Sequence, residues 1–513
     1  MLFEITRDQL ADGGFSERFP SWIEVDERSV SITGDRTGFR EAFVWNSGDR
    51  ILVATTLEEL LPAISTEPGS PAVSPFGISQ ILNHGFVPLP HTVYDGVIRL
   101  GPGDTASILA DRGRLVRRII SNYPWQSGAS RQDQLPRTAK LRELIASSVD
   151  NQLTSTGGEG FLMLSSGKDS VALALALADN GHVQVPCLTF KSGPGDSEHV
   201  YAAEVCDRLG LEHHTVDMPS DPAKVEAAML RFFERSPIPS ADPATIPYVM
   251  VAEMAGLDRG GAIDGSGNDG YMGYLPSSHD RIKHSLRIRN RRLAEITTKL
   301  VPHDSPLNYF ARSRTGTFLP LRMFRERETR NLYGGAVDTE SFWYDTDDDA
   351  GGLDLVDFIG VSATRHTDNA LSNPKVYLVA RSRGLDPLLP FCDAELADYY
   401  FNLPEENRFD LSARTNKTLL RQLLAEALDY DPEVVGSNYF AFDGASFLSA
   451  NSGFVREEIL SCDLWLPTLK PMLKEWMDAL PDRPFLFHSL LALFMISGWH
   501  NHSVFRSPNP ANL

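Results

Sequence analysis

The chain has 513 residues, of which 42% are hydrophobic, so it carries enough apolar material for the cores of about two to four domains. Its 48 Lys and Arg stand against 68 Asp and Glu, a formal net charge of −20 that disfavours binding to nucleic acid or to an anionic membrane. The four cysteines form no CxxC pair or zinc pattern, no apolar run reaches the ~18 residues of a membrane span, and no signal-peptide core is present, so we expect a cytoplasmic protein.

The first part of the chain, residues 1–125, is predicted to form a small β-rich domain. Short alternating apolar runs such as 22–25 are bounded there by Gly, Asp and Pro. The polar stretch 126–134 is predicted to be a linker. Helical periodicity begins near Leu141, and we expect the second domain to cover 136–513.

The next part alternates between strand and helix patterns. The runs 161–164 and 185–190 are short and apolar, as in buried parallel strands, and the Ala- and Leu-rich stretch 171–178 between them favours a helix. This alternation predicts an α/β fold with a parallel sheet, followed after about residue 360 by a mostly helical part. The acidic stretch 344–349 is predicted to be a solvated loop, with metal binding as the alternative.

The most informative segment, Ser165-Ser166-Gly167-Lys168-Asp169-Ser170, lies between the first of these strands and its helix. N–H groups at a helix start and the helix dipole favour an anion, the serines add hydroxyl donors, and Gly167 lets the backbone approach a phosphate. Lys168 adds a cation, whereas Asp169 is suited to Mg²⁺. The alternative is an ordinary Ser/Asp helix cap. The segment is not a Walker A motif, because Leu162 stands where that motif needs its first glycine.

This loop resembles the pyrophosphate loop of ATP pyrophosphatases, with Ser166 in place of a glycine. Other segments resemble asparagine synthetase and its relatives, the β-lactam synthetases and lasso-peptide cyclases; in chain order they are 34–38, 84–94, 100–103, 196–214, 264–274, 384–393 and 416–421. The rival interpretation of 265–270, a dinucleotide-binding GxGxxG turn, lacks the helix that this motif requires. The resemblance covers nearly the whole chain. It implies a parallel-sheet ATP-pyrophosphatase domain, of the adenine nucleotide alpha-hydrolase-like kind, with a helical C-terminal part and a degenerate N-terminal-nucleophile domain before it.

The resemblance also implies a reaction and its cofactors, ATP and Mg²⁺. An ATP-dependent carbon-nitrogen ligase of this kind activates a carboxylate as an acyl-adenylate, releases pyrophosphate and transfers the acyl group to an amine or ammonia, with AMP as the second product. The residues expected at the nucleotide are Leu164, Ser165, Ser166, Gly167, Lys168, Asp169, Ser170, Ser192, Asp264 and Gly265. Asp169 and Asp269 are expected to hold Mg²⁺. The expected catalytic residues are Asp386, for orienting the acceptor amine, with Lys168 and Tyr439; Lys417 is a further candidate for phosphate contact, although its sequence context is more typical of a helix surface.

Departures from the family pattern limit this implied function. Family members that use glutamine begin with a catalytic Cys, whereas this chain has Leu2, and its first cysteine is Cys187, so we expect no glutaminase activity. The family's catalytic Lys falls near Tyr439, so either another cation serves or the chemistry is altered or lost. Positions Ser266 and Asp386 also differ from the β-lactam synthetase pattern.

Three functions therefore remain open. The first is a ligase of a specialised biosynthetic pathway that joins a small-molecule or peptide carboxylate to an amine or ammonia. The second is a lasso-peptide macrocyclase, and the third is a catalytically silent ATP-binding scaffold. We expect no nucleic-acid or membrane partner, and both a homodimer and a pathway partner protein remain open.

Overall fold

The computed structural model describes the chain except for residues 13–18, 27–28, 48, 66–70, 112–113, 122, 126–133, 192–196, 287, 289, 302–304, 320, 322, 350–352, 431–441 and 507–513. Three predictions fall on these positions: almost all of the linker 126–134, Ser192 and Tyr439 lie outside the described residues. No helix in the described part of the chain has the length and apolar character to cross a bilayer.

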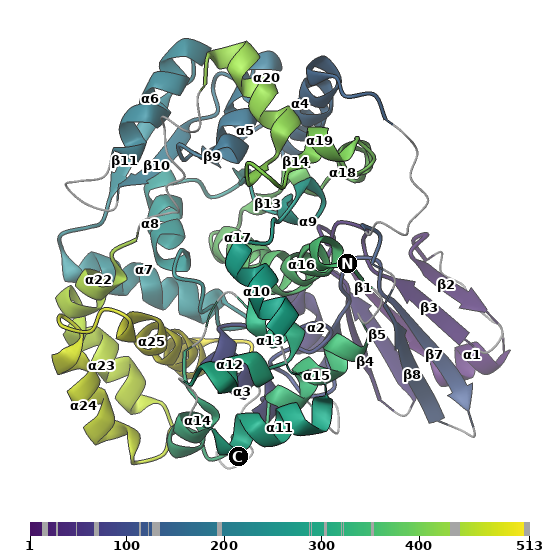
Figure 1. Ribbon diagram of the computed structural model, residues 1–513, viewed down its shortest axis with the longest axis vertical. Helices are drawn as coiled ribbons and strands as arrows, with labels where there is room; N and C mark the ends of the chain where they lie inside the picture. Colours follow the sequence, from purple (N-terminus) through teal and green to yellow (C-terminus); the bar gives the residue numbers. More distant parts are fainter. Residues whose placement is uncertain are drawn as a thin grey trace.

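The N-terminal part contains two antiparallel sheets (Figure 1). One has the order β1-β5-β4-β6 and consists of β1 (Leu2–Thr6), β5 (Arg50–Ala54), β4 (Phe43–Asn46) and β6 (Ile98–Arg99). The other has the order β2-β3-β7-β8 and consists of β2 (Ile23–Asp26), β3 (Ser29–Thr33), β7 (Thr105–Asp111) and β8 (Arg114–Ile120). Alternate residues such as Val30 and Ile32 on β3 point into a core that both sheets share. The helices α1 (Arg7–Asp12), α2 (Leu57–Ser65) and α3 (Pro75–His84) complete this part.

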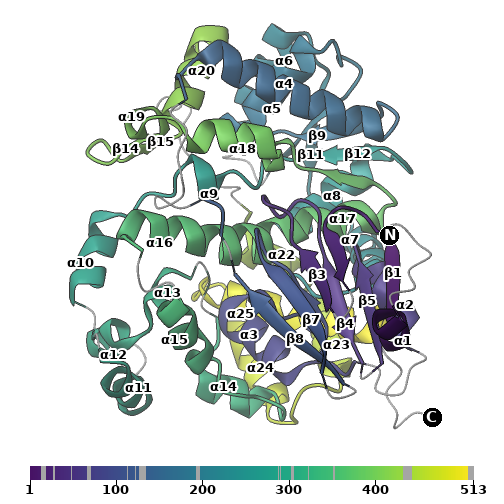
Figure 2. The ribbon, with the colours of Figure 1, turned by 90° about the vertical axis from the view of Figure 1, so that its right-hand side faces the viewer.

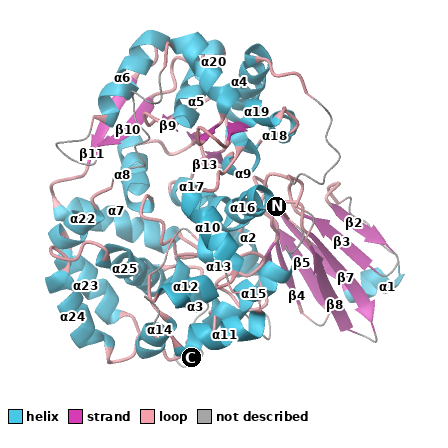
Figure 3. Cartoon of the chain, in the orientation of Figure 1, coloured by secondary structure: helices cyan, strands magenta, loops and turns pink. Residues whose placement is uncertain are grey.

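The remaining chain contains a separate five-stranded sheet, in the upper half of Figure 3, and its strands are parallel as predicted. Its order is β11-β10-β9-β12-β13, with β9 (Gly160–Met163), β10 (Cys187–Lys191), β11 (His213–Asp217), β12 (Gly261–Ile263) and β13 (Asp386–Leu388). The chain runs outward from β9 through β10 to β11 and then returns to β12 on the other side of β9. Such a reversal opens a crevice beyond the carboxyl ends of the two central strands, where ligands bind in open α/β sheets.

Helices cover both faces of this sheet, because successive residues of a strand point to opposite sides. Leu162 and Leu164 share a core with α4 (Thr138–Ser155), α5 (Lys168–Asp179), α6 (Glu198–Leu209) and α20 (Thr418–Leu428). Phe161 and Met163 belong to the opposite core, with α7 (Pro222–Arg235), α8 (Thr245–Ala255), α17 (Asn373–Ser382) and α25 (Leu486–His502). The short apolar strands are therefore buried from both sides, as their composition predicts.

The chain becomes mostly helical well before residue 360, which corrects the sequence prediction. Before β13, the last strand of the five-stranded sheet, the remaining helices are α9 (Asp269–Met272), α10 (Ser278–Leu286), α11 (Arg291–Leu300), α12 (Pro306–Ala311), α13 (Arg314–Phe318), α14 (Glu326–Leu332), α15 (Glu340–Asp349), α16 (Leu355–Ser362) and the π-helix η1 (Ala363–Ser372). After β13 come η2 (Pro390–Cys392), α18 (Ala394–Phe401), α19 (Glu405–Arg408), the small hairpin of β14 (Phe409–Asp410) and β15 (Thr415–Asn416), and then α22 (Gly444–Ala450), α23 (Ser452–Ser461) and α24 (Leu469–Ala479).

The acidic stretch 344–349 is helical and is not the predicted loop, since it forms the second half of α15. Its Asp347 accepts hydrogen bonds from the backbone N–H of Thr315 at 2.7 Å and from the hydroxyl of the same residue at 2.8 Å. The carboxylate thus satisfies a donor at the start of α13. Within the described part of the chain, no group of three or more His, Cys, Asp or Glu side chains is arranged to hold a metal ion, here or elsewhere.

Candidate active site

The candidate site lies where the loops that follow β9 and β12 meet. The first loop ends at Gly167, where α5 begins, and no side chain caps the first turn of this helix. The second loop passes through Gly265, where an added Cβ would lie only 3.2 Å from the Cβ of Asp169 and from the backbone nitrogen of Ser170. The two loops are therefore in close contact, and the N–H groups of the first turn of α5 are available to an anion beside them.

The serines of the first loop mainly hold the loop itself. The Ser170 hydroxyl accepts a hydrogen bond from the backbone N–H of Ser165 at 3.0 Å and lies 2.8 Å from the Ser165 hydroxyl, which in turn accepts from the N–H of Gly167 at 3.1 Å. The N–H of Ser166 donates to the buried carboxylate of Glu198 at 3.1 Å. The hydroxyl groups of Ser165 and Ser170 therefore stabilise the conformation of the loop 165–170. The Ser166 side chain is directed toward Glu198.

A buried lysine is the central feature of the site. Lys417 is only 2% exposed, and its Nζ lies 2.8 Å from Asp169 Oδ2, 2.8 Å from Asp269 Oδ1 and 2.7 Å from Asn268 Oδ1. Asn268 also donates from Nδ2 to Asp169 Oδ1 at 2.9 Å. Lys417 has a left-handed backbone with φ of 57°, a conformation that costs a non-glycine residue about 1–2 kcal/mol. This turn precedes α20 and directs the side chain into the protein rather than onto the helix surface.

Charges in this cluster shift the pKa values of its members. Burial alone would raise the pKa of Asp169, but Lys417 and Lys168 outweigh it and hold this pKa below its ordinary value. Burial lowers the pKa of the Lys168 ammonium, while the charge of Asp169 opposes the shift. For Lys417 the carboxylates of Asp169 and Asp269 overcome the effect of burial and raise the pKa above its ordinary value. Lys417 is therefore a fixed cation at any physiological pH.

A further carboxyl group, Asp368, lies beside this cluster and was not identified from the sequence. It is buried in the π-helix η1, and its Oδ2 has no hydrogen-bond partner among the described residues. Burial and the negative charge of Asp269 raise its pKa well above the ordinary value, although Lys417 opposes the shift. α9 approaches η1 very closely at this point, since a Cβ on Gly270 would lie 1.5 Å from the Thr364 hydroxyl.

Two nucleotide-binding candidates are buried beside the loops. Asp264 is 3% exposed and accepts hydrogen bonds from the Tyr248 hydroxyl and from the Ser266 backbone N–H, the latter at 2.9 Å. Leu164, at the end of β9, is also buried. Asp264 thus fixes the second loop through its own carboxylate. The helix that begins within the segment 265–270 is only the four-residue α9, so it is too short to support the rival dinucleotide-binding interpretation.

Asp386 does not join the cluster, which corrects its sequence-based placement. It is exposed and begins β13, where it pairs with Gly261, and Gly261 in turn pairs with Gly160 at the start of β9. Because these strands are parallel, Asp386 lies at their amino ends, at the edge of the sheet opposite to the loop 165–170. The sequence motif predicts the type of residue and its position along the chain. It does not predict which end of β13 faces the loop 165–170.

The N-terminal part contacts the π-helix directly. Arg365 makes a bidentate ion pair with the fully buried Asp104, at 2.9 and 3.0 Å. Arg99 donates to the carbonyl of Asn369, and the Tyr123 hydroxyl donates to Thr364 Oγ1 at 2.7 Å. These contacts flank Asp368 on both sides in the sequence. The N-terminal part therefore holds η1, the helix that carries Asp368, beside the lysine cluster formed by Lys417, Asp169, Asp269 and Asn268.

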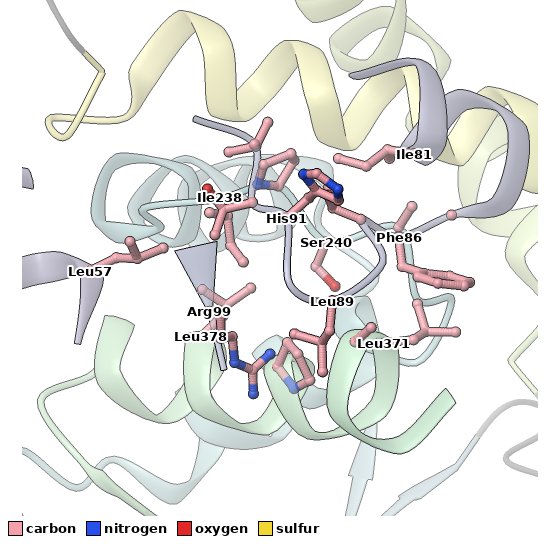
Figure 4. Close-up of a pocket in the computed structure, with 18 of the residues that line it drawn as sticks. Leu57, Ile81, Phe86, Leu89, His91, Arg99, Ile238, Ser240, Leu371 and Leu378 are labelled. Carbon is pink, nitrogen blue, oxygen red and sulfur yellow. The ribbon is translucent and has the colours of Figure 1, made fainter. Parts of the chain in front are cut away.

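A cavity lies along the same interface (Figure 4). Its walls include Phe86, Leu89 and His91 from the N-terminal part, Ser240 after α7 and Leu371 from η1. The interior space is about 50 Å³, which leaves room for a few water molecules but not for a nucleotide. In size and lining, the cavity therefore differs from the charged site at the carboxyl ends of β9 and β12.

The family model described as asparagine synthase matches residues 140–433. This range contains the loop 165–170, the Asp264–Asp269 loop, Asp368 and Lys417. A comparison with curated proteins finds none that matches.

Proposed function

Because the chain belongs to the asparagine synthase family, it is an ATP-dependent amide-forming ligase at the family level, and we propose that it activates a carboxylate as an acyl-adenylate with release of pyrophosphate. The observation that carries this proposal is the position of Lys417, which is buried between two carboxylates at the carboxyl ends of β9 and β12. The amine or ammonia that completes the reaction would attack the adenylate carbonyl.

The cations of the site support cleavage between the α- and β-phosphates of ATP. The open first turn of α5 offers backbone N–H groups, and Lys168 and Lys417 add two positive charges near them. Such an arrangement stabilises negative charge on a leaving pyrophosphate. This chain lacks the family's lysine near Tyr439. The buried Lys417 supplies another cation to the site, and this favours an active ligase over a silent scaffold.

The residues of the site fit a bound Mg²⁺. Asp169, Asp269 and Asn268 direct side-chain oxygens toward one point, which Lys417 Nζ now occupies. Carboxylate and amide oxygens suit this ion, which usually keeps several waters and is bound by one or two carboxylates together with substrate phosphates. When bound, Mg²⁺ would neutralise the pyrophosphate as it leaves. Asp169, Asp269 and Asn268 would hold the ion, and Lys417 would contribute its positive charge to the phosphates beside them.

We propose Asp368, in place of Asp386, as the group that orients the acceptor amine. A carboxyl group with one unbonded oxygen in a buried position can accept a hydrogen bond from an entering N–H donor. Burial and the charge of Asp269 raise its pKa well above the ordinary value, which favours the uncharged form of the group. An approaching amine would therefore meet a carboxyl group that is close to the reacting centre and shielded from water.

The test is the fate of a carboxylate oxygen. Candidate carboxylates are first screened for ATP–pyrophosphate exchange, and the active substrate is then labelled with oxygen-18. An acyl-adenylate passes one label to AMP when the amine attacks. Formation of ADP and phosphate, or AMP without label, would overturn the mechanism. ATP binding without any cleavage across the screen would instead favour the scaffold, and an intramolecular amide in a peptide product would identify a macrocyclase.

A further inference from the structure

An exposed apolar surface lies on α10, α11 and α12, outside the candidate active site. Its aliphatic side chains are Ile282 and Leu286 on α10, Leu293, Ile296 and Leu300 on α11, and Leu307 on α12, and they are between 51% and 78% exposed. Figure 2 shows these three helices together along the left edge of the molecule. Clustered aliphatic side chains of this size on a surface mark an interaction site more often than chance exposure.

The spacing shows that α10 and α11 each present an apolar stripe to solvent, and α12 adds Leu307 beside them. Ile282 and Leu286 are four residues apart, and Leu293, Ile296 and Leu300 follow at intervals of three and four. Residues with these intervals share one face of a helix. On α11 the small Ala294 is buried while the three large side chains point outward. The most apolar face of α11 is therefore exposed to solvent and does not pack against the rest of the protein.

The charge of this segment is opposite to that of the whole chain. Residues 278–300 contain seven Lys or Arg and two Asp or Glu, a formal charge of +5, in a chain whose formal net charge is −20. Arg281 and Arg292 are exposed directly beside Ile282 and Leu293. An apolar stripe with a basic border is complementary to an acidic amphipathic helix, which offers apolar residues at its centre and carboxylates at its edges.

The surface is also connected to the active site. α10 follows α9, which carries Asp269, and the carbonyl of Gly273 between these helices accepts a hydrogen bond from Asn416 Nδ2 at 3.1 Å. Asn416 directly precedes Lys417. A partner bound on α10 would therefore be held a short distance along the chain from the lysine cluster.

We propose that α10, α11 and α12 form the docking surface for an acidic amphipathic helix of a partner protein. A second copy of this chain is a poorer occupant, since an isologous contact would bring two segments of charge +5 together. An anionic membrane is also a poorer occupant, because the chain as a whole has a formal net charge of −20. An acidic helix of a partner protein would contact only the basic segment, so neither of these repulsions between like charges would arise.

The test measures binding of a synthetic acidic peptide to the full-length chain. The peptide has about 20 residues, long enough to form a helix, with Leu at helical spacing and Glu elsewhere. A scrambled peptide of the same composition has no apolar face and is the control. We expect the amphipathic peptide to bind at least about tenfold more tightly than the scrambled one, and more weakly as salt is raised.

Two double variants and one single control variant locate the binding. Leu286→Gln with Leu293→Gln should weaken binding at least about tenfold, and so should Arg281→Glu with Arg292→Glu. Met254→Gln on α8, which replaces an equally exposed apolar residue outside the surface, should leave binding unchanged. All five substituted positions are exposed, so the thermal unfolding midpoint should not change. This binding assay needs no ATP cleavage, so its result is independent of the proposed reaction.

Four results would overturn the proposal. One is equal affinity for the amphipathic and scrambled peptides, and another is equal loss of binding in the Met254→Gln control. The third is binding to phosphatidylserine vesicles but not to the peptide, which would identify a membrane surface. The fourth is a dimer of the chain that dissociates when Leu286 and Leu293 are replaced, which would identify a second copy as the occupant.

Discussion

Replacement of Lys417 by Met tests whether the buried ammonium holds the site together. Methionine has nearly the same volume, so the change removes the charge without leaving a large cavity. Removing one partner of a fully buried ion pair costs about 3–5 kcal/mol. Here the side chains of Asp169 and Asp269 are 27% and 37% exposed, and water can hydrate them in part. We therefore expect the free energy of unfolding to fall by about 2–3 kcal/mol at pH 8.

The loss of stability should depend on pH in a defined direction. Lys417 lowers the pKa of Asp169 in the folded protein, so its stabilisation is present above the unfolded carboxyl pKa of about 3.9 and is lost as the pH falls through the lower folded value. The difference in the free energy of unfolding between wild type and Lys417→Met should therefore narrow as the pH falls below about 4. Added Mg²⁺ should stabilise the variant more than the wild type, because it replaces the missing cation between the carboxylates.

Urea unfolding followed by tryptophan fluorescence measures these differences. The matched control is Lys470→Met, since Lys470 is an exposed lysine on α24 and should contribute little. Equal stability of wild type and Lys417→Met at pH 8 would refute the reasoning. The same conclusion would follow if Lys470→Met lost as much stability, or if the loss in Lys417→Met were independent of pH.

Three further predictions concern activity. Asp169→Asn should lower carboxylate-dependent ATP cleavage by at least about a hundredfold, near 2.7 kcal/mol, with an unchanged circular dichroism spectrum, and near wild-type turnover would exclude its role at the phosphates. Asp368→Asn should reduce amide formation far more than Asp386→Asn, when product is measured by mass spectrometry; similar losses would show that the buried carboxyl has no special part. Glutamate release from glutamine should stay at background, because all four cysteines are buried; release by homogeneous protein would contradict this.

The sequence predicts the parallel sheet well, because its signals are local. The short apolar runs that become β9 and β10 are buried from both sides, and the Ser165–Ser170 loop follows β9 at the start of α5. Strand, loop and helix lie within a few residues of one another, so composition and spacing are enough to identify them. The same local reasoning fails for 344–349, where a run of carboxylates favours solvent but one of them caps a neighbouring helix.

The members of the lysine cluster are harder to predict because they are distant in sequence. Lys417 lies 248 residues from Asp169, and its context predicts a helix surface; only its left-handed backbone turns it inward. Asp368 has no motif around it, and its importance comes from the π-helix and from packing against α9. Asp386 illustrates the opposite case. It has the expected residue type in the expected motif, but it lies at the amino end of β13, and the carboxyl end of that strand faces the site.

The ion pair between Arg365 and the buried Asp104 sets a rule for exchanging parts of this protein. A chimaera that joined the ligase part to the N-terminal part of a relative would lose the carboxylate that receives Arg365 unless the donor supplied one at the same place. The guanidinium would then be left without its partner beside η1, and the helix that carries Asp368 would lose its support. An exchange of the N-terminal part therefore requires a carboxylate at the position of Asp104 in the replacement.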